Sequence, residues 1–242
     1  MINNYFISEV KKLNIKITNK ELDLLEQYYN FLIKYNEHTN ITAITKKEDV
    51  YIKHFLDSLM VTKAINFNKI NNLIDIGSGA GFPGIVLKIF FPNIKIILLD
   101  SNNKKTTFLN EVIKKLNLKD IQVVNLRAEE YMKNHLNEFD ICISRAVAYI
   151  DIITSLSLPF IKEDGSVILM KGNYQDEIKI LNTYKKELHI SNFDIINYKI
   201  LSDDNNRSLI IIRKNEVTSK IVNYPKILKQ SEMRRKKLNL IL

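Results

Sequence analysis

The 242-residue sequence contains a single cysteine, Cys142. One cysteine excludes a disulfide framework and a thiolate metal cluster. Because Cys142 lies in the apolar run FDICIS, we expect it to be a small core residue. The sequence also lacks a group of His, Cys and carboxylate residues at the spacing of metal ligands, so we expect no metal site.

Long hydrophobic runs are missing as well. None approaches the roughly eighteen residues that span a bilayer. The first residues, MINNYFISEVKK, lack the basic region and apolar stretch of a secretory leader. We therefore expect a cytoplasmic protein without a membrane partner. With 45% hydrophobic residues, the chain is able to bury a substantial core.

Acidic residues are fewer than basic ones, and 27 Asp and Glu against 36 Lys and Arg give a formal net charge of +9. This excess favours a polyanionic partner. Residues 214–242 contain eight basic and two acidic residues, so this short segment alone has a net charge of +6. A cationic tail on a nearly balanced body resembles an arm for nucleic acid or an anionic surface, and a solvated terminal helix is the alternative.

Glycine is concentrated in one place. Four of the six glycines lie in the stretch LIDIGSGAGFPGI, residues 73–85. Its first residues form a short apolar run typical of a buried strand, and the pattern after Gly84 has the density of a helix. The glycines therefore occupy a strand-to-helix turn, where a ligand contacts bare backbone because no Cβ keeps it away.

The residues before this turn show helical patterns. Two capping boxes, Thr18 to Glu21 and Thr45 to Glu48, each precede an amphipathic pattern. With a short helix around residues 6–13, they predict a helical layer ahead of the glycine turn.

From residue 72 onward, strand and helix patterns alternate. We expect strands at residues 73–76, 95–100, 121–125, 139–144, 165–170, about 193–200 and 207–213. This alternation predicts an α/β fold with a Rossmann-like, mostly parallel sheet of seven strands covered on both faces. The short polar turn SDDNN predicts that the last two strands form an antiparallel hairpin at one edge.

The patterns divide the chain into three parts. We expect an N-terminal helical extension over residues 1–66, an α/β domain over residues 67–213 and a basic tail over residues 214–242. The tail is expected to be partly helical, with a broken apolar stripe made of Ile227, Leu228, Ser231, Leu238 and Ile241.

A carboxylate stands beside the glycine turn at the end of a predicted strand, where open α/β sheets bind their ligands. Asp75 opens the pattern D-x-G-x-G-x-G, which continues through Gly77, Gly79 and Gly81. This carboxylate repels the pyrophosphate of a dinucleotide and attracts the sulfonium and ammonium of S-adenosyl-L-methionine. The sign of Asp75 therefore favours a methyl donor. A carboxylate that caps the start of the helix is the alternative.

A second carboxylate, Asp100, ends the strand KIILLD and is positioned to hydrogen-bond ribose hydroxyls, with a turn residue as the alternative. The frame Gly79, Gly81 and Gly84 also matches the dinucleotide pattern G-x-G-x-x-G. A nicotinamide oxidoreductase is therefore a competing hypothesis, and the charge of Asp75 disfavours it.

The sequence lacks the motifs of two methyltransferase classes, which narrows the choice of methyl acceptor. Methylation of carbon 5 of a pyrimidine needs a cysteine nucleophile, whereas Cys142 is expected inside a strand. Adenine amine methyltransferases have an Asn or Asp, Pro, Pro, aromatic tetrapeptide after the fourth strand, and here that segment reads ISRAVAY. A ring nitrogen with a free lone pair, such as guanine N7, needs neither a base nor a covalent intermediate. Proximity and alignment with the sulfonium then supply most of the rate.

The chain resembles the RsmG family, also called GidB, the bacterial 16S rRNA guanine-N7 methyltransferases. The matching stretches run in order over roughly residues 20–213: NITAIT (40–45), HFLDSL (54–59), LIDIGSGAGFPGI, LLDS (98–101), RAEE (127–130), ISRAVA (143–148) and LMKG (169–172). The glycine turn with its Phe-Pro-Gly ending, together with HFLDSL and SRA, is a specific combination.

The resemblance implies a class I S-adenosyl-L-methionine-dependent methyltransferase fold and methylation at N7 of one guanine, the 527-type position in the 530 loop of 16S rRNA. It also implies that the partner is 16S rRNA or the small ribosomal subunit. The protein is then expected to be a monomer and to need no obligate protein partner. Matched by motif, the donor contacts fall on Gly77, Phe82, Ala128, Glu129 and Arg145, with Asp100 on the ribose. Arg145 is suited to the donor's carboxylate or to an RNA phosphate, and both remain open.

Three further side chains have more than one interpretation. Phe82 is expected to line the pocket wall or stack on the ligand, with core packing as an equal alternative. His54, near Asp57, is best interpreted as a packed, hydrogen-bonded core histidine. Lys171 ends a strand on the ligand side, so it joins Arg145 as a candidate for contacting phosphate or guanine, and a solvated lysine is as good an interpretation. No catalytic residue is assigned.

The tail departs from the family pattern. After Tyr224 and Pro225, many members have a proline- and glycine-rich basic segment, whereas this chain continues as KILKQSEMRRKKLNLIL. A hypothesis of another class rests on this tail: an RNA-binding ribosome-assembly protein whose nucleotide pocket is catalytically silent.

Overall fold

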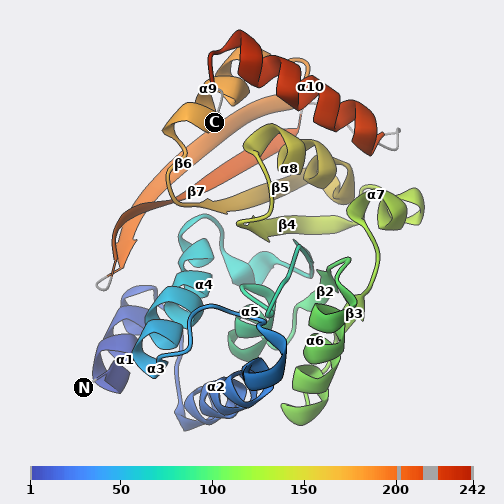
Figure 1. The fold of residues 1–242 in the computed structure, drawn as a ribbon. Coiled ribbons are helices and arrows are strands. Elements are labelled where there is room, and N and C mark those ends of the chain that lie inside the picture. Colours follow the sequence, from blue (N-terminus) through green and yellow to red (C-terminus); the bar gives the residue numbers. More distant parts are fainter. Residues whose placement is uncertain (1, 201–202, 215–222, 241–242) are drawn as a thin grey trace.

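The computed structural model describes residues 2–200, 203–214 and 223–240. Its centre is a seven-stranded sheet in the order β3-β2-β1-β4-β5-β7-β6. The first five strands are parallel, and β7 is antiparallel to both β5 and β6 (Figure 1). The predicted hairpin is therefore confirmed at one edge, with β7 inserted between β5 and the edge strand β6. The strands are β1 Asn72–Ile76, β2 Lys95–Leu99, β3 Ile121–Val124, β4 Phe139–Arg145, β5 Ile161–Lys171, β6 Ile190–Ile200 and β7 Asp203–Lys214.

Helices cover both faces of the sheet, as the sequence predicts. Two hydrophobic clusters are separated by the strands, because neighbouring residues of a strand point to opposite faces. Leu73 belongs to one cluster and Ile74 to the other. The single cysteine is fully buried in the second cluster, which confirms the expectation for Cys142. The helices are α1 Ile2–Lys12, α2 Asn19–Thr39, α3 Lys47–Asp49, α4 Asp57–Leu59, α5 Gly84–Phe90, α6 Asn103–Lys115, α7 Ala128–Tyr131, α8 Ile150–Ser157, α9 Gln175–Tyr184 and α10 Tyr224–Lys237.

The N-terminal helices pack on the same face as α5 and α6. Phe6, Leu25 and Leu32 are fully buried in one cluster with Phe108 and with residues of the central strands. The helical layer thus shares its core with the sheet. The expected boundaries at residues 66 and 213 stay a prediction.

The two predicted capping boxes have different outcomes. At the start of α2, the Thr18 N–H donates to Glu21 Oε2 over 2.8 Å, so the first box is confirmed. The second is wrong, since α3 begins after Lys46, one residue later than the box requires, and has no side-chain cap. The carbonyl of Thr45 instead accepts a hydrogen bond from the Tyr29 hydroxyl on α2. From α3 the chain continues through a π-helical turn, residues 50–56, into α4.

The predicted helix in the basic tail is present as α10. The side chain of Asn223 caps it by accepting the Lys226 N–H over 2.9 Å. Ile227 and Ser231 are buried against the body of the protein, whereas Leu228 is 41% exposed. The tail helix is thus docked rather than fully solvated, and Ile241 lies outside the described residues.

Within the described ranges, no helix is both long and apolar enough to cross a bilayer. No three His, Cys, Asp or Glu side chains of the described residues are grouped to hold a metal ion.

Candidate functional site

A pocket of about 430 Å³ opens at the carboxyl ends of β1, β2 and β4. This is the edge where ligands bind in open α/β sheets. The pocket brings together most residues that the sequence singles out: Gly77, Gly79, Phe82, Asp100, Ala128, Glu129 and Arg145. Asp75, Gly81 and Lys171 are not among its lining residues.

The glycine turn forms the floor of the pocket. The Gly77 N–H donates to the carbonyl of Leu99 over 2.7 Å, which ties the turn to the neighbouring strand. Gly77 has φ +70°, and a Cβ there would overlap Val147 Cγ2. Gly79 has φ +59°, and a Cβ there would meet only the carbonyl oxygen of Gly77, at 3.8 Å, so this part of the turn faces open space. Both positions need glycine because L-residues rarely adopt positive φ.

Asp75 lies beneath the turn rather than in the pocket. Its side chain is fully buried, and Oδ2 accepts the N–H of Gly84 at the start of α5 over 2.9 Å. Burial raises the pKa of Asp75 to about 7. The hydrogen bond supports the alternative interpretation of Asp75, a carboxylate at the helix start that holds the turn in shape.

Asp100 is at the pocket wall, and its carboxylate joins two loops. Oδ2 accepts the N–H of Gly79 over 3.0 Å, and Oδ1 accepts the N–H of Asn102 over 2.8 Å. A carboxylate has about four acceptor positions, so these two bonds leave room for hydroxyl donors from the pocket.

Phe82 combines two of its predicted roles. Its ring lines the pocket, although only 4% of the residue is exposed, and it lies 4.3 Å from the His54 ring at an interplanar angle of 16°. Phe82 also packs on Tyr28, whose hydroxyl donates to the carbonyl of Ala80. Helix α2 therefore supports the glycine turn directly.

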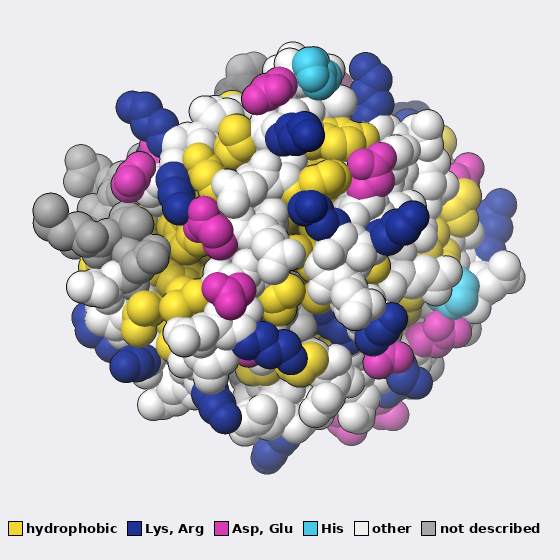
Figure 2. All heavy atoms as spheres, turned by 90° about the horizontal axis from the view of Figure 1, so that it is seen from below, with side chains coloured by type: hydrophobic (Ala, Val, Ile, Leu, Met, Phe, Trp, Pro, Cys, Tyr) yellow, Lys and Arg dark blue, Asp and Glu magenta, His cyan; other side chains and the backbone are white. Residues whose placement is uncertain are grey.

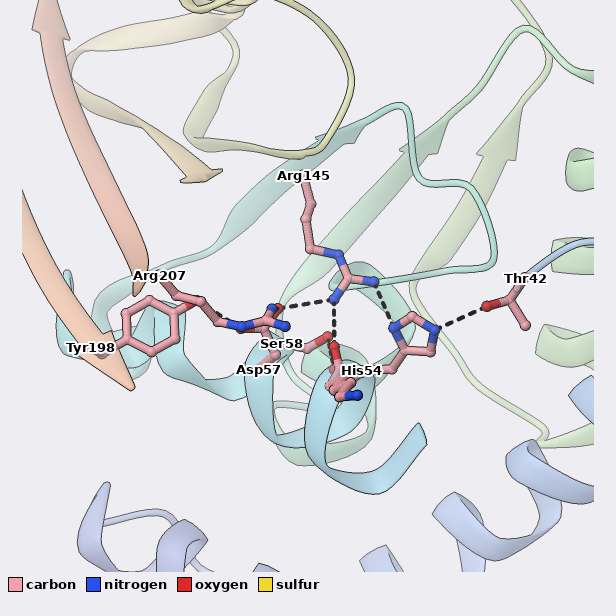
Figure 3. Close-up of polar contacts among 8 residues, drawn as sticks. Thr42, His54, Asp57, Ser58, Arg145, Tyr198 and Arg207 are labelled. Atoms are coloured by element: carbon pink, nitrogen blue, oxygen red, sulfur yellow. Dashed lines mark hydrogen bonds and ion pairs between the residues drawn. The ribbon is translucent and has the colours of Figure 1, made fainter. Parts of the chain in front are cut away.

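Arg145 connects the end of β4 to the helical layer (Figure 3). Its guanidinium donates to Asp57 Oδ2 over 3.1 Å and to His54 Nδ1 over 3.2 Å, and it lies 5.3 Å from the centre of the Phe82 ring. Because an arginine only donates, His54 Nδ1 accepts, and Nε2–H donates to Thr42 Oγ1 over 3.0 Å. Burial and the nearby Arg145 lower the pKa of His54 to about 3, so the ring is neutral at physiological pH.

Asp57 is the centre of this polar cluster (Figure 3). It is 1% exposed, and it also pairs with Arg207 of β7 over 3.0 Å and accepts the Tyr198 hydroxyl of β6 over 2.8 Å. One carboxylate faces two guanidinium groups while His54 is neutral. Of the two arginines, Arg145 also lines the pocket, where its guanidinium suits an anionic group.

At the other end of the pocket, the turn after β3 supplies Ala128 and Glu129. Both begin α7, and Ala128 is 9% exposed in the cluster on the second face of the sheet. Leu156 of α8 and Tyr224 of α10 complete this end. The pocket thus runs from the polar cluster around Arg145 to a second end, called the apolar end after Leu126, Ala128 and Leu156, where the charged Arg127 and Glu129 also lie.

Lys171 has a structural pairing instead of a pocket position. Its Nζ donates to Glu177 Oε2 over 2.8 Å and to the carbonyl of Ala148 over 2.7 Å. Glu177 Oε2 also accepts the N–H of Ile150 over 2.6 Å. Lys171 and Glu177 therefore hold the segment between β4 and α8, and Lys171 does not line the pocket beside the glycine turn.

Sequence reasoning missed several contributors: Tyr28, Thr42, Tyr198, Arg207 and Tyr224. Thr42 lies in the motif NITAIT, so the motif was a usable signal. Tyr224 lies in the Tyr-Pro pair shared with the family, so that pair was a usable signal too. The other three come from helices and strands whose local patterns indicate only packing, and their polar roles depend on which elements meet.

The sheet order, the inserted antiparallel β7 and the glycine turn after β1 define a class I methyltransferase fold. The solved ribosomal protein L11 methylase from Lactobacillus delbrueckii subsp. bulgaricus is similar to this chain in fold, with a TM-score of 0.51, 18% sequence identity and coverage of 67% of this chain and 79% of that chain. At this identity the similarity concerns the fold alone.

The sequence model of the family described as rRNA small subunit methyltransferase G (GidB) matches residues 21–210, and the chain belongs to this family. A ribosomal RNA small subunit methyltransferase G from Mesoplasma florum is 46% identical over 238 residues, which cover 96% of this chain and 98% of that protein. One from Mycoplasma capricolum subsp. capricolum is 44% identical over 227 residues, covering 91% and 94%.

Proposed function

We propose that the protein transfers the methyl group of S-adenosyl-L-methionine to N7 of a single guanine, the 527-type position in the 530 loop of 16S rRNA. The observation that carries the proposal is the pocket itself. In a chain of the GidB family, a glycine turn, Asp100 and Arg145 surround one cavity at the carboxyl ends of the strands. Its volume of about 430 Å³ lies in the usual range for ligand pockets.

The donor is seated along the length of the pocket. Its ribose hydroxyls bond the free acceptor positions of Asp100, and its adenine lies against Ala128 and Glu129 at the apolar end. The methionine part then lies over Gly77 and Gly79, towards Arg145. Bound S-adenosyl-L-methionine supplies an electrophilic methyl group, and the residues of the chain only bind and align the reactants.

The acceptor side has no titratable group that the reaction needs. Guanine N7 has its own lone pair, so no base is required. His54 is neutral, and its Nδ1 accepts from Arg145 while its Nε2 bonds Thr42, so it is engaged as a structural residue. The guanidinium of Arg145 binds either the donor's carboxylate or an RNA phosphate. We assign no catalytic residue.

The surface charge supports an RNA contact through a limited region. On the face seen from below in Figure 2, Lys and Arg side chains are interspersed with Asp and Glu. By contrast, the outer side of α10 has four exposed lysines, Lys226, Lys229, Lys236 and Lys237. We propose that this side contacts rRNA, that the protein acts as a monomer in the cytoplasm, and that residues 1–66, 67–213 and 214–242 are its three parts.

The test is to incubate the protein with S-adenosyl-L-methionine and small ribosomal subunits that lack the modification, and then to map 7-methylguanine by borohydride and aniline strand scission. A single new break in the 530 loop is the expected result. Donor binding without a strand break would support the donor pocket and show that the methyl acceptor is not this guanine N7. The absence of both donor binding and a strand break would favour the alternative hypothesis, a catalytically silent assembly factor.

A further inference from the structure

The C-terminal helix reaches the donor pocket. Tyr224, the first residue of α10, lines the cavity together with Leu156 of α8. Tyr224 packs against the hydrophobic cluster that contains Ala128, whereas Phe82, at the polar end, belongs to the cluster on the opposite face of the sheet. Tyr224 therefore stands at the apolar end of the pocket, about 80 positions after Arg145 in the sequence.

A buried ion pair holds α10 in this position. Asp151 of α8 is fully buried, and it accepts the Ser231 hydroxyl over 2.9 Å and an N–H of Arg234 over 3.2 Å. Only 6% of the Arg234 side chain is exposed. A charge buried this deeply needs its partner, because removing one member leaves the other uncompensated. The contact thus specifies where α10 lies.

Two further contacts fix the same helix. The Arg235 guanidinium lies 4.1 Å from the centre of the Tyr149 ring, in the segment between β4 and α8. Ile227, 6% exposed, is part of the cluster that contains Leu156. In Figure 1, α10 lies across the top of the molecule beside α8 and α9. The basic tail is therefore a packed element of the fold along its inner side.

We propose that α10 completes the donor pocket and that the ring of Tyr224 covers the adenine of S-adenosyl-L-methionine. The inference rests on the proposed function, because the orientation of the donor in the pocket is part of that proposal. Aromatic rings stack on bases whatever their identity, and Tyr224 is the aromatic side chain that lines the apolar end of the cavity in the described part of the chain. The tail thus has two sides: an inner one that shapes the donor site and an outer one that presents lysines.

The test measures donor binding alone, by isothermal titration calorimetry with S-adenosylhomocysteine and with adenosine. We expect Tyr224→Ala to weaken both ligands by the same factor, about tenfold, because each contains the adenine that the ring covers. Tyr224→Phe keeps the ring and should stay within about twofold of the wild type. The control is Met233→Ala, a change on the outer side of the same helix at a residue that is 46% exposed. Circular dichroism checks that each variant is folded.

Wild-type affinity of Tyr224→Ala for both ligands would overturn the inference while leaving the proposed function intact. A loss for S-adenosylhomocysteine but not for adenosine would also overturn it, because the ring would then contact the amino-acid part. If the wild-type protein bound neither ligand, the proposed function itself would fail.

A second variant tests the positioning by α10. Arg234 does not line the pocket, so Arg234→Met affects the donor only through the placement of the helix. We expect a loss of affinity similar to that of Tyr224→Ala, and no additional loss when both changes are combined. Independent, additive losses would show that α10 does not place Tyr224.

Discussion

At the scale of single side chains, two buried carboxylates determine the shape of the glycine turn at the pocket. Asp75 and Asp100 both stand beside the glycine turn, and each accepts a backbone N–H of that turn or of the helix that follows it. Only Asp100 also lines the cavity. The same residue type therefore has two tasks, one in holding the turn and one in offering acceptors to a ligand.

Asp75→Asn separates these tasks. Asparagine keeps an acceptor for the Gly84 N–H but has no charge. Folding raises the pKa of Asp75 from 3.8 to about 7, so the protonated form is favoured in the folded state. The wild type then loses stability as the pH rises from about 4 to 7, and the variant lacks this loss. Unfolding by urea at pH 4 and pH 7 should show the variant gaining stability relative to the wild type.

The same variant tests whether Asp75 attracts the sulfonium. S-adenosylhomocysteine, the product, lacks that positive charge. If Asp75 attracted the sulfonium directly, Asp75→Asn would therefore lower the affinity for S-adenosyl-L-methionine more than the affinity for S-adenosylhomocysteine. Because Asp75 lies under the turn, we expect the ratio of the two affinities to be unchanged. If Asp75→Asn lowered the affinity for S-adenosyl-L-methionine relative to that for S-adenosylhomocysteine, the interpretation of Asp75 as a residue that attracts the sulfonium would be restored.

Gly77→Ala should abolish donor binding. The added Cβ would overlap Val147 Cγ2, and the backbone has φ +70°. The turn must therefore shift, which removes the surface on which the donor rests. The matched control is Gly172→Ala, where the added Cβ meets nothing within 4 Å. Calorimetry with S-adenosylhomocysteine checks both, and unchanged affinity in Gly77→Ala would contradict the seating of the donor over this turn.

Separate elements are joined at the pocket by a few polar contacts. The π-helical turn and α4 contribute His54 and Asp57, β4 contributes Arg145, and β7 contributes Arg207. One buried carboxylate thus joins the helical layer to the central strand and the edge hairpin. Arg145 keeps its position because all three elements meet at Asp57.

Asp57→Asn should destabilise the protein by about 3 kcal/mol, because it removes the buried carboxylate with which both guanidinium groups pair. The matched control is Asp194→Asn, which removes a carboxylate from the exposed pair with Arg213, where Asp194 is 61% exposed. Exposed pairs contribute about 0–1 kcal/mol. Thermal and urea unfolding compare the two, and equal losses would contradict the central role of Asp57.

For the whole molecule, the position of the excess charge matters more than its amount. The sequence predicts that truncation after Arg213 weakens RNA affinity and flattens its salt dependence. Since α10 is packed on α8 and reaches the pocket, such a truncation would also expose buried surface. Substitution on the outer side of α10 separates the two effects.

Changing Lys226, Lys229, Lys236 and Lys237 to Gln should weaken rRNA binding and reduce the slope of log affinity against log salt by roughly 0.7–0.9 for each phosphate that is no longer neutralised. Donor affinity should stay at the wild-type value. The control replaces four exposed lysines of the N-terminal region, Lys11, Lys12, Lys16 and Lys20, by Gln. Filter binding over a range of salt concentrations measures the slopes, and equal slopes for both sets would remove α10 from the RNA interface.

Local sequence patterns by themselves determined the strands, the glycine turn, the parallel sheet with its edge hairpin and the buried Cys142. These features follow from periodicity and from the conformations open to glycine, both of which act over a few residues. The motifs in the same order also indicated the family and most of the residues around the pocket.

Only the tertiary structure decided which polar groups meet. The structure places Asp75 under the turn and pairs Lys171 with Glu177. The cluster around Asp57 and the docking of α10 join residues far apart in the chain. Each depends on which elements the fold brings into contact and on the need of a buried charge for a partner there. A carboxylate or lysine at a strand end looks the same in sequence whether it faces the pocket or a neighbouring element.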